Sequence, residues 1–307
     1  MKEITRLLAI DVGGTELKYG IIDNNYNISS KGYIKAPNDT VEDFLDAIYN
    51  LYLKFDNIDA IVVSMPGFVN SDNGMHLGGG HFHSLKDTQI QKLIIDKCNC
   101  DCFIENDGKS ATIAEYYLGN LKDTTNSSVF IIGTGVGGGL IINGQLLKGI
   151  NYTAGEYSYF DIDVNDNNPR FSTLSEYCST RALLKMYKDS SPSKEIIDGR
   201  EFFKRYHAGD LDAINVLNQF AEYVAKEIMN LGILLNVEKV AIGGGISSQD
   251  ILLIKIKEKL EDLDMLKIYP ETNLFKPEVV KCKYENDANL IGVAYEYLQR
   301  KEDKNGI

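Results

Sequence analysis

The chain has 307 residues, of which 44% are hydrophobic and 25% charged, and its formal net charge is −12. This composition is that of a folded globular protein and excludes disordered and fibrous classes. The acidic excess argues against a nucleic-acid partner, because such binding depends on Lys and Arg contacts to phosphates. A length above about 250–300 residues predicts two domains.

The sequence also argues against a membrane or exported protein. No apolar run approaches the roughly 18–20 residues of a membrane-spanning helix. The first residues lack the apolar core and small-residue cleavage site of an export signal. Five cysteines are an odd number, far below the density of disulfide-stabilised domains. We therefore expect a cytoplasmic protein with no membrane partner.

Apolar periodicity predicts alternating strands and helices along the first part of the chain. Thr40 or Asp39 is suited to cap the first helix, since Glu42 and Asp43 follow in its first turn. The predicted elements are strands at 7–10 and 17–23, a helix at 41–51, strands at 60–64 and 103–105, and a helix at 111–118.

A second series begins near residue 129. It again opens with a strand, a glycine-rich turn (133–139) and a returning strand, and Asn143-Gly144 after it is a strong hairpin signal. The predicted elements are strands at 129–132 and 140–142, helices at about 174–187 and 213–235, a strand at 239–242, and helices at 251–263 and about 288–299. Two series of this kind predict a duplicated α/β unit.

Two glycine turns are suited to bind phosphates. Glycines expose backbone N–H groups without Cβ atoms in the way, and a polyphosphate needs such donors. In the first turn, Gly13, Gly14 and Thr15 supply donors, Lys18 could add a positive charge, and Asp11 could hold Mg²⁺ through water. The alternative is a plain hairpin turn.

The second turn, with Thr134 and Gly135, is a further glycine turn between strands that could bind phosphate. Neither turn matches a P-loop or a dinucleotide-binding fingerprint. A third glycine run, Gly243-Gly244-Gly245, follows a predicted strand and would allow close approach of adenosine, or would simply form a tight strand-to-helix turn.

Several carboxylates are candidates for chemistry on an alcohol. Asp107 follows a strand and could accept a proton while Asn106 aligns the hydroxyl, although Asn-Asp-Gly is also a common turn. Glu156 and Glu176 could each bind vicinal sugar hydroxyls, or lie on the surface as solvated charges. Cys98-x-Cys100-x-Cys102 departs from zinc-site spacing, so we interpret these residues as incidental thiols.

Taken together, the motifs resemble the ROK family of bacterial sugar kinases and related repressors, over essentially the whole chain. The order and spacing of the following segments carry the resemblance: Asp11-x-Gly-Gly-Thr15, Pro66-Gly67, Glu105-Asn106-Asp107, 133–140, Asn143-Gly144, Ala154-Gly-Glu156, 242–245 and Asn289-Leu-Ile-Gly292-Val-Ala294.

The resemblance implies a fold and a reaction. The expected fold is the duplicated actin/hexokinase-like (ribonuclease H-like) fold, with a central cleft between domain 1–117 plus 288–307 and domain 118–287. The expected reaction is transfer of a phosphoryl group from ATP-Mg²⁺ to a sugar hydroxyl, with a homodimer possible.

By position in the family motifs, Asp107 is expected to be the catalytic base. The residues expected to bind sugar are Asn106, Glu156, Tyr159, Glu176, Gly67 and Gly79. The residues expected to bind ATP are Asp11, Gly13, Gly14, Thr15, Lys18, Thr134, Gly135, Gly243, Gly244 and Gly245.

Two departures from the family pattern refine these expectations. Tyr159 replaces the usual His, and 166–176 lacks the cysteines of the usual zinc segment, so no structural zinc is expected there. Together with 67–70 and 78–80, this pattern is similar to the zinc-less β-glucoside kinases, which phosphorylate the 6-hydroxyl of the non-reducing glucose.

Two alternatives to a β-glucoside kinase stay open. A hexokinase acting on glucose, fructose or N-acetylmannosamine fits the same motifs, and so does a non-catalytic sugar sensor. A repressor is disfavoured, because Asp11 lies too close to Met1 for the DNA-binding segment that precedes the first hairpin in the family's repressors.

Overall fold

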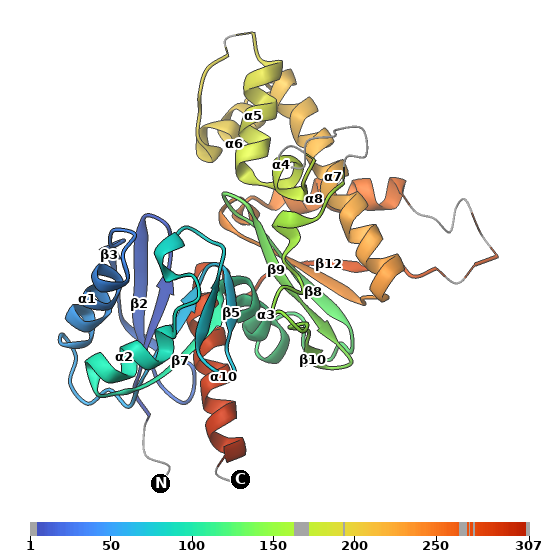
Figure 1. Ribbon diagram of the computed structural model, residues 1–307. Coiled ribbons are helices and arrows are strands. Elements are labelled where there is room, and N and C mark those ends of the chain that lie inside the picture. The colour runs from blue at the N-terminus through green and yellow to red at the C-terminus, as the bar shows by residue number, and fades with distance from the viewer. Residues whose placement is uncertain are drawn as a thin grey trace. The chain divides into compact units, whose positions relative to one another are not determined.

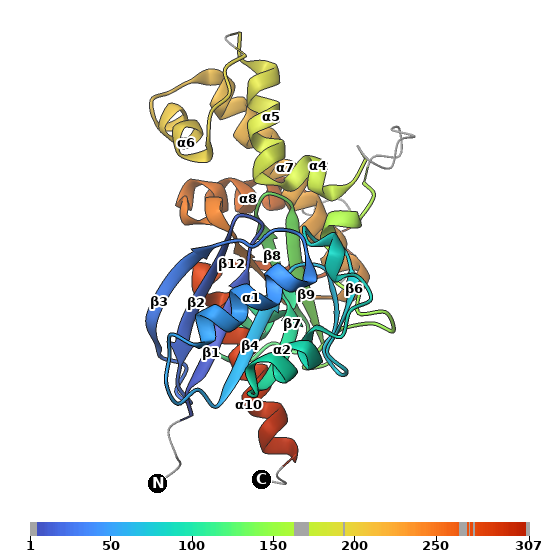
Figure 2. The same ribbon diagram turned by 60° about the vertical axis from the view of Figure 1, so that its left-hand side comes forward.

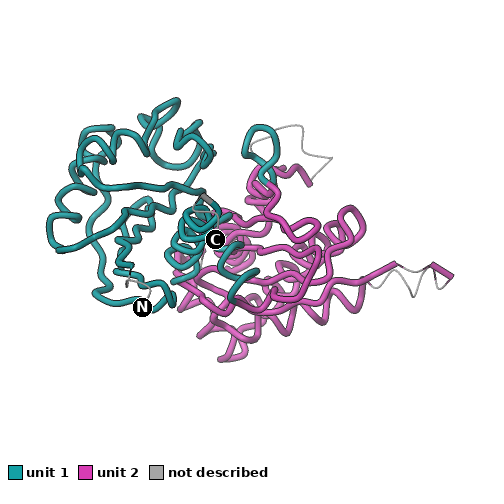
Figure 3. The backbone as a smooth tube through the Cα atoms, turned by 90° about the horizontal axis from the view of Figure 1, so that it is seen from below, with its two compact units in different colours: residues 1–118, 148–154, 287–307 teal, residues 119–147, 155–286 magenta. Residues whose placement is uncertain are grey.

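The computed structural model describes residues 5–162, 172–192, 194–263, 269, 271–272 and 274–304. Figures 1 and 2 show the elements, and Figure 3 colours the two compact units into which the chain divides. Unit 1 comprises residues 1–118, 148–154 and 287–307, and unit 2 comprises 119–147 and 155–286. The short segment 148–154 thus belongs to unit 1 although unit 2 precedes and follows it in the sequence.

Unit 1 is built on a five-stranded sheet of order β3-β2-β1-β4-β7. β1 pairs antiparallel with β2 and parallel with β4, and β4 pairs parallel with β7. The strands are β1 (Leu7–Val12), β2 (Glu16–Ile22), β3 (Ile28–Lys35), β4 (Ala60–Met65) and β7 (Asp101–Asn106). A small hairpin of β5 (Phe68–Asn70) and β6 (Met75–Gly78) lies outside this sheet.

Successive residues of β1 point to opposite faces of the sheet, which is why both faces are apolar. Leu8 and Ile10 pack with α1 (Val41–Tyr52) and α2 (Ile90–Cys98). On the other face, Leu7 and Ala9 share a core with α10 (Ala288–Lys304).

The helix α3 (Asp107–Tyr117) packs against α10. A Cβ atom at Gly292 would lie 1.7 Å from the carbonyl oxygen of Ser110, so only glycine allows this approach. The close packing fixes the start of α3, which carries Asp107.

Unit 2 repeats the same pairing scheme, with strand order β10-β9-β8-β11-β12. β8 pairs antiparallel with β9 and parallel with β11. The strands are β8 (Ser127–Ile132), β9 (Val136–Ile142), β10 (Gln145–Leu146), β11 (Lys239–Gly243) and β12 (Glu278–Lys281). The predicted duplication of an α/β unit is confirmed.

The helices of unit 2 surround one large apolar core. The long helix α7 supplies many of its residues, including Phe220, Val224 and Ile228. The helices are α4 (Leu174–Cys178), α5 (Thr180–Ser190), α6 (Gly199–His207), α7 (Leu211–Leu235) and α8 (Asp250–Asp262). Across the described part of the chain, no helix combines the length and apolarity needed to cross a membrane.

Three sequence-based boundaries are wrong, each for a local reason. The helix predicted at 111–118 begins already at Asp107, because the side chain of Asn106 caps it by accepting from the backbone N–H of Lys109. The single helix predicted at 174–187 is two, α4 and α5, because Ser179 is extended and caps α5. The glycine turn ends at Gly135, and Gly137–Gly139 lie in β9.

Candidate active site

Asp11, near the end of β1, is held by three side chains of unit 1. Its Oδ1 accepts hydrogen bonds from Asn289 Nδ2 at 2.8 Å and Ser64 Oγ at 3.4 Å. Lys18 Nζ, on the paired strand β2, lies 3.3 Å from Asp11 Oδ2. These contacts fix the carboxylate at the sheet end and balance its charge. The structure therefore places Lys18 beside Asp11.

The first glycine turn lies directly after β1 and joins it to β2. The N–H of Gly13 donates to the Glu16 carbonyl at 3.0 Å, which closes the hairpin. A Cβ atom on Gly14 would lie 2.9 Å from the ring of His81, so the small residue lets that ring approach. Gly14 and Thr15 are exposed.

The start of α3 holds Asp107 in a fixed orientation. Asp107 Oδ1 accepts from the N–H of Gly108 at 2.7 Å and from Asn106 Nδ2 at 3.0 Å. A carboxylate in the first turn of a helix is also stabilised by the helix dipole. These two hydrogen bonds hold the Asp107 carboxylate in place at the start of α3.

Asn106 is buried, and most of its hydrogen-bonding capacity is used inside unit 1. Its Oδ1 accepts from Lys109 N–H at 2.9 Å, and its Nδ2 donates to the Gly67 carbonyl at 2.9 Å as well as to Asp107. Asn106 therefore ties the loop at Gly67 to Asp107. The role of Asn106 as a sugar ligand stays a prediction. One lone pair on Oδ1 is left to accept a hydrogen bond from a sugar hydroxyl.

Gly67 and Gly79 are brought together by the hairpin of β5 and β6. Both have positive φ, +97° and +78°. A Cβ atom on Gly67 would lie 2.8 Å from the Gly79 carbonyl oxygen and 2.7 Å from His76 Nε2. His76 itself is buried and hydrogen-bonds the Pro66 carbonyl at 3.0 Å, and burial lowers the pKa of its imidazole. Gly67, Gly79, Asn106 and Asp107 thus form one rigid corner of unit 1.

A buried ion pair supports this corner, and sequence analysis did not find it. Glu105 is fully buried, and its Oε1 accepts from the N–H of Asn106 at 2.9 Å. Its Oε2 accepts from Lys148 Nζ at 2.8 Å, and Lys148 also donates to Ser71 Oγ at 2.8 Å. Lys148 belongs to the inserted segment 148–154, and 43 positions separate it from Glu105, so no local pattern indicates the pair.

In unit 2, the second glycine turn and the third glycine run line one cavity of about 820 Å³. The turn contributes Gly133 and Thr134, and the run contributes Gly244 and Gly245. The sequence did not single out the side chains from the start of α6 that complete the lining, Asp198, Arg200 and Phe203. This size and mixture of backbone and polar groups fit a nucleotide.

The glycines in and beside this cavity differ in how far the backbone requires them. Gly244 has a φ of +95°, and a Cβ atom there would lie 2.2 Å from the Ile132 carbonyl oxygen. A Cβ atom on Gly243 would lie 2.7 Å from Ile131 Cδ1, and Gly135 lies against Ser158 and Ser175. A Cβ atom on Gly245 would meet nothing within 4 Å, so the surface at this glycine is open to a ligand.

The predicted sugar-binding side chains of unit 2 lie on two neighbouring segments. Leu174 N–H donates to the Phe160 carbonyl at 2.6 Å, which joins the segment of Glu156 and Tyr159 to that of Glu176. Glu176 is engaged in an ion pair with Arg181. Tyr159 is 62% exposed, in contrast to Tyr157, which is 4% exposed and hydrogen-bonded to Ser128.

Two segments were considered as metal sites from the sequence: the three cysteines at 98–102 and the segment 166–176. Cys98, Cys100 and Cys102 are buried, and burial raises the pKa of Cys98 to about 11, so these thiols stay protonated. Of the segment 166–176, residues 166–171 lie outside the described residues. Among the residues that the structure describes, no group of three or more His, Cys, Asp or Glu could hold a metal ion.

ATP and Mg²⁺ place different demands on these residues. The cavity of unit 2 is suited to ATP in its size and lining, and the surface at Gly245 is open to a ligand. Asp11 fits Mg²⁺ through water rather than directly, because Asn289, Ser64 and Lys18 already surround the carboxylate. Asn289 and Ser64 were not predicted as site residues, although Asn289 opens the last motif of the chain.

Comparisons with known proteins agree with this geometry. The ROK family model matches residues 7–300. The β-glucoside kinase of Listeria monocytogenes serovar 1/2a is 27% identical over 298 residues, which cover 96% of this chain and 98% of the relative. The N-acetylmannosamine kinase of Haemophilus influenzae strain PittGG is 28% identical over 295 residues and covers 94% of each chain.

A solved structure has the same fold. The crystal structure of a ROK family protein from Streptococcus pneumoniae TIGR4, in complex with sucrose, matches with a TM-score of 0.85 at 25% identity. The match covers 97% of this chain and 100% of that chain. The two repeated sheets are thus those of the duplicated actin/hexokinase-like fold.

Proposed function

We propose a specific acceptor for this chain, which belongs to the ROK family and is an ATP-dependent sugar kinase. The acceptor is the 6-hydroxyl of the non-reducing glucose of a β-glucoside such as cellobiose. The observation that carries the assignment is Tyr159, a 62% exposed phenol where the family pattern has a His. The similarity to a β-glucoside kinase over 96% of the chain supports it.

The roles of the residues follow from their chemistry. The 6-hydroxyl gives its proton to the carboxylate of Asp107 while its oxygen forms a bond to the γ-phosphorus. The bond from that phosphorus to the bridging oxygen of ADP breaks, so ADP leaves with the electron pair. Positioning and electrostatics carry most of the catalysis in such transfers.

The remaining groups bind and orient. Gly244, Gly245 and Thr134 are assigned to the nucleotide, and Glu156 and Glu176 to sugar hydroxyls. Bound Mg²⁺ would neutralise phosphate charge, and Asp11 would hold its water shell. Asn106 keeps Asp107 in the orientation that accepts the proton.

A second candidate is a kinase for a free hexose or N-acetylmannosamine. The N-acetylmannosamine kinase at 28% identity supports it about as strongly as the β-glucoside kinase at 27%. In this alternative, Tyr159 acts only as a hydroxyl donor. A sugar sensor without catalysis is a third candidate, which the intact Asn106, Asp107 and Thr134 disfavour.

A coupled assay of ADP release separates the three candidates. We expect turnover with cellobiose, gentiobiose or an aryl β-glucoside to exceed that with glucose, mannose, fructose and N-acetylmannosamine. A preference for a free monosaccharide would replace the proposal by the second candidate, and no turnover with any sugar would favour the sensor. In the active enzyme, Glu156→Gln should raise the sugar KM, and an unchanged KM would remove Glu156 from the sugar site.

A further inference from the structure

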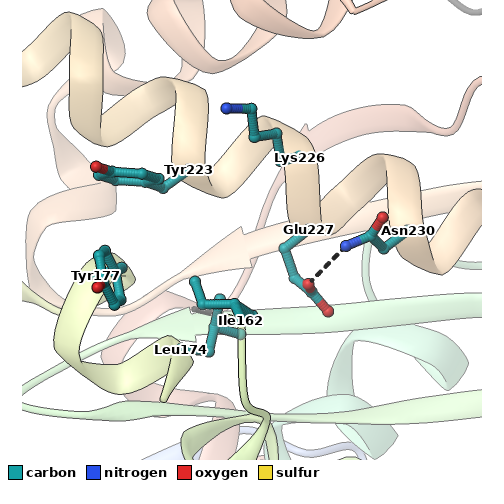
Figure 4. Close-up of a pocket in the computed structure, with 7 residues that line it drawn as sticks. All are labelled: Ile162, Leu174, Tyr177, Tyr223, Lys226, Glu227 and Asn230. Atoms are coloured by element: carbon teal, nitrogen blue, oxygen red, sulfur yellow. Dashed lines mark hydrogen bonds between the residues drawn. The ribbon is translucent and has the colours of Figure 1, made fainter. Parts of the chain in front are cut away.

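Unit 2 contains another cavity, with no lining residue in common with the one beside Thr134. Its volume is about 310 Å³, at the lower end of the range for small-molecule sites. Figure 4 shows its walls, which combine two aliphatic side chains, two tyrosines and three polar side chains. The lining residues are Ile162, Leu174, Tyr177, Tyr223, Lys226, Glu227 and Asn230.

The unusual member of this lining is Glu227, a carboxyl group with little hydrogen bonding. The residue is 2% exposed. Among the described residues, its one hydrogen-bond partner is Asn230, whose Nδ2 lies 3.3 Å from Glu227 Oε2. Burial raises the pKa of Glu227 to about 7. A buried carboxyl with one long hydrogen bond is costly, and the fold retains it at the wall of a cavity.

Among the residues that the structure describes, the ionisable groups around Glu227 leave its charge uncompensated. Tyr157 and Cys178 lie close enough to interact with it electrostatically, but burial raises the pKa of both, so they are neutral near pH 7. Lys226 Nζ lies 2.7 Å from Glu222 Oε1, and Figure 4 shows its side chain extending away from the Glu227 carboxyl. The neighbouring lysine therefore does not neutralise Glu227.

The aromatic part of the wall adds a second feature. Tyr177 of α4 and Tyr223 of α7 pack edge to face, with ring centroids 5.1 Å apart and an interplanar angle of 72°. Aromatic faces attract cations through their quadrupole. An aromatic wall and a buried acid together are suited to a ligand with one positive charge and an apolar body.

We propose that this cavity is a binding site for a small organic cation, a primary amine with an apolar or aromatic body. The ammonium group donates to the Glu227 carboxylate in a charge-assisted hydrogen bond, and the body packs against Tyr177, Tyr223, Ile162 and Leu174. Charge-assisted hydrogen bonds are roughly twice as strong as neutral ones. The proposal does not depend on which sugar the kinase phosphorylates.

The test uses benzylamine as the probe and benzyl alcohol as its neutral analogue, with binding to the whole protein followed by calorimetry or ligand-observed NMR. We expect benzylamine to bind the wild type at least about tenfold more tightly than benzyl alcohol. In Glu227→Gln the two ligands should bind with nearly equal affinity, because the amide cannot carry the negative charge. Asp212→Asn, at a partly exposed acid on the same helix, is the matched control and should change nothing.

The pH dependence gives an independent readout. Below pH 7 the Glu227 carboxyl is mostly protonated and the amine must displace that proton. Benzylamine affinity should therefore rise about fivefold from pH 6 to pH 7, reach about tenfold at pH 8, and level off above that pH. The rise should be absent in Glu227→Gln and unchanged in Asp107→Asn.

Three outcomes would overturn the proposal. They are equal binding of benzylamine and benzyl alcohol, a preference for benzylamine that survives Glu227→Gln, and a wild-type affinity that does not change between pH 6 and pH 8. The first and third use only the wild type, so they decide the matter even if the variant does not fold.

Discussion

The sheets of the two units have the same strand order but carry opposite chemistry at the same position. In unit 1, Asp11 of β1 is paired in register with Lys18 and with Ser64. In unit 2, the residue in the corresponding place is Ile131, which is paired with Gly137 and Gly243. An ion pair and a serine in one unit are replaced by an aliphatic residue and two glycines in the other.

This difference shows how one duplicated scaffold can divide the work of a kinase. Charges at the end of a sheet can orient a metal's water shell, whereas glycines leave flat backbone against which a nucleoside can lie. The strands determine only where these residues lie, and the side chains determine what chemistry the position can perform. If this division is correct, substitutions in unit 1 should affect catalysis and charge, and substitutions in unit 2 should affect nucleotide affinity.

The largest expected effect is on catalysis in unit 1. Asp107→Asn should lower kcat by about 10²–10⁴-fold while ATP and sugar still bind, because the amide cannot accept the proton. Steady-state kinetics with the best sugar measures the change, and Asp56→Asn, at an exposed acid of the same unit, is the control. Near-normal turnover of Asp107→Asn would rule out Asp107 as the base.

Lys148→Met should lower the free energy of unfolding by about 3 kcal/mol, because it leaves the buried Glu105 without its counter-charge. Urea unfolding measures this, and the double variant with Glu105→Gln should recover most of the loss. Lys92→Met breaks an exposed ion pair with Asp96 and should cost no more than about 1 kcal/mol. Equal losses for both lysines would show that the buried pair has no special role.

In unit 2, two adjacent glycines should respond differently to the same change. Gly244→Ala should destabilise the protein by about 1–3 kcal/mol, because it combines a positive φ with a clash against the Ile132 carbonyl. Gly245→Ala meets open space, so it should fold normally and raise the KM for ATP by about fivefold, or ~1 kcal/mol. An unchanged KM in Gly245→Ala would remove this glycine from the nucleotide site.

A last pair of substitutions, which includes the smallest expected effect, separates the two donors to Asp11. Asn289→Ala removes a 2.8 Å hydrogen bond to a carboxylate and should cost about 1.5–3 kcal/mol in stability. Ser64→Ala removes a 3.4 Å contact and should cost under about 1 kcal/mol. Thermal unfolding of the two variants compares them, and the reverse order would contradict the description of Asp11.

Local sequence signals predicted the repeated hairpins and the N-cap of α1. The glycine turns between short apolar runs marked both hairpins, and Thr40 does accept from the N–H of Asp43. The start of α3 was missed because Asn106-Asp107-Gly108 also fits a turn, whereas in the structure the Asn106 side chain caps the helix.

Long-range features could not be predicted in this way. Lys148 reaches Glu105, and Asn289 reaches Asp11, across 43 and 278 positions, so no spacing in the sequence indicates either contact. The cavity at Glu227 also depends on residues from three separate stretches of unit 2. The family resemblance indicated which residues to examine, but not which of them hold each other in place.

The way α10 completes unit 1 has a consequence for synthesis on the ribosome. Leu290, Val293 and Ala294 cover the face of the first sheet that carries Leu7 and Ala9, yet they are translated long after the strands of that sheet. At a translation rate of about 5–20 residues per second, that apolar face stays uncovered by α10 for about 10–35 s after β7 has been made. The nascent chain should therefore be a client of chaperones until α10 emerges.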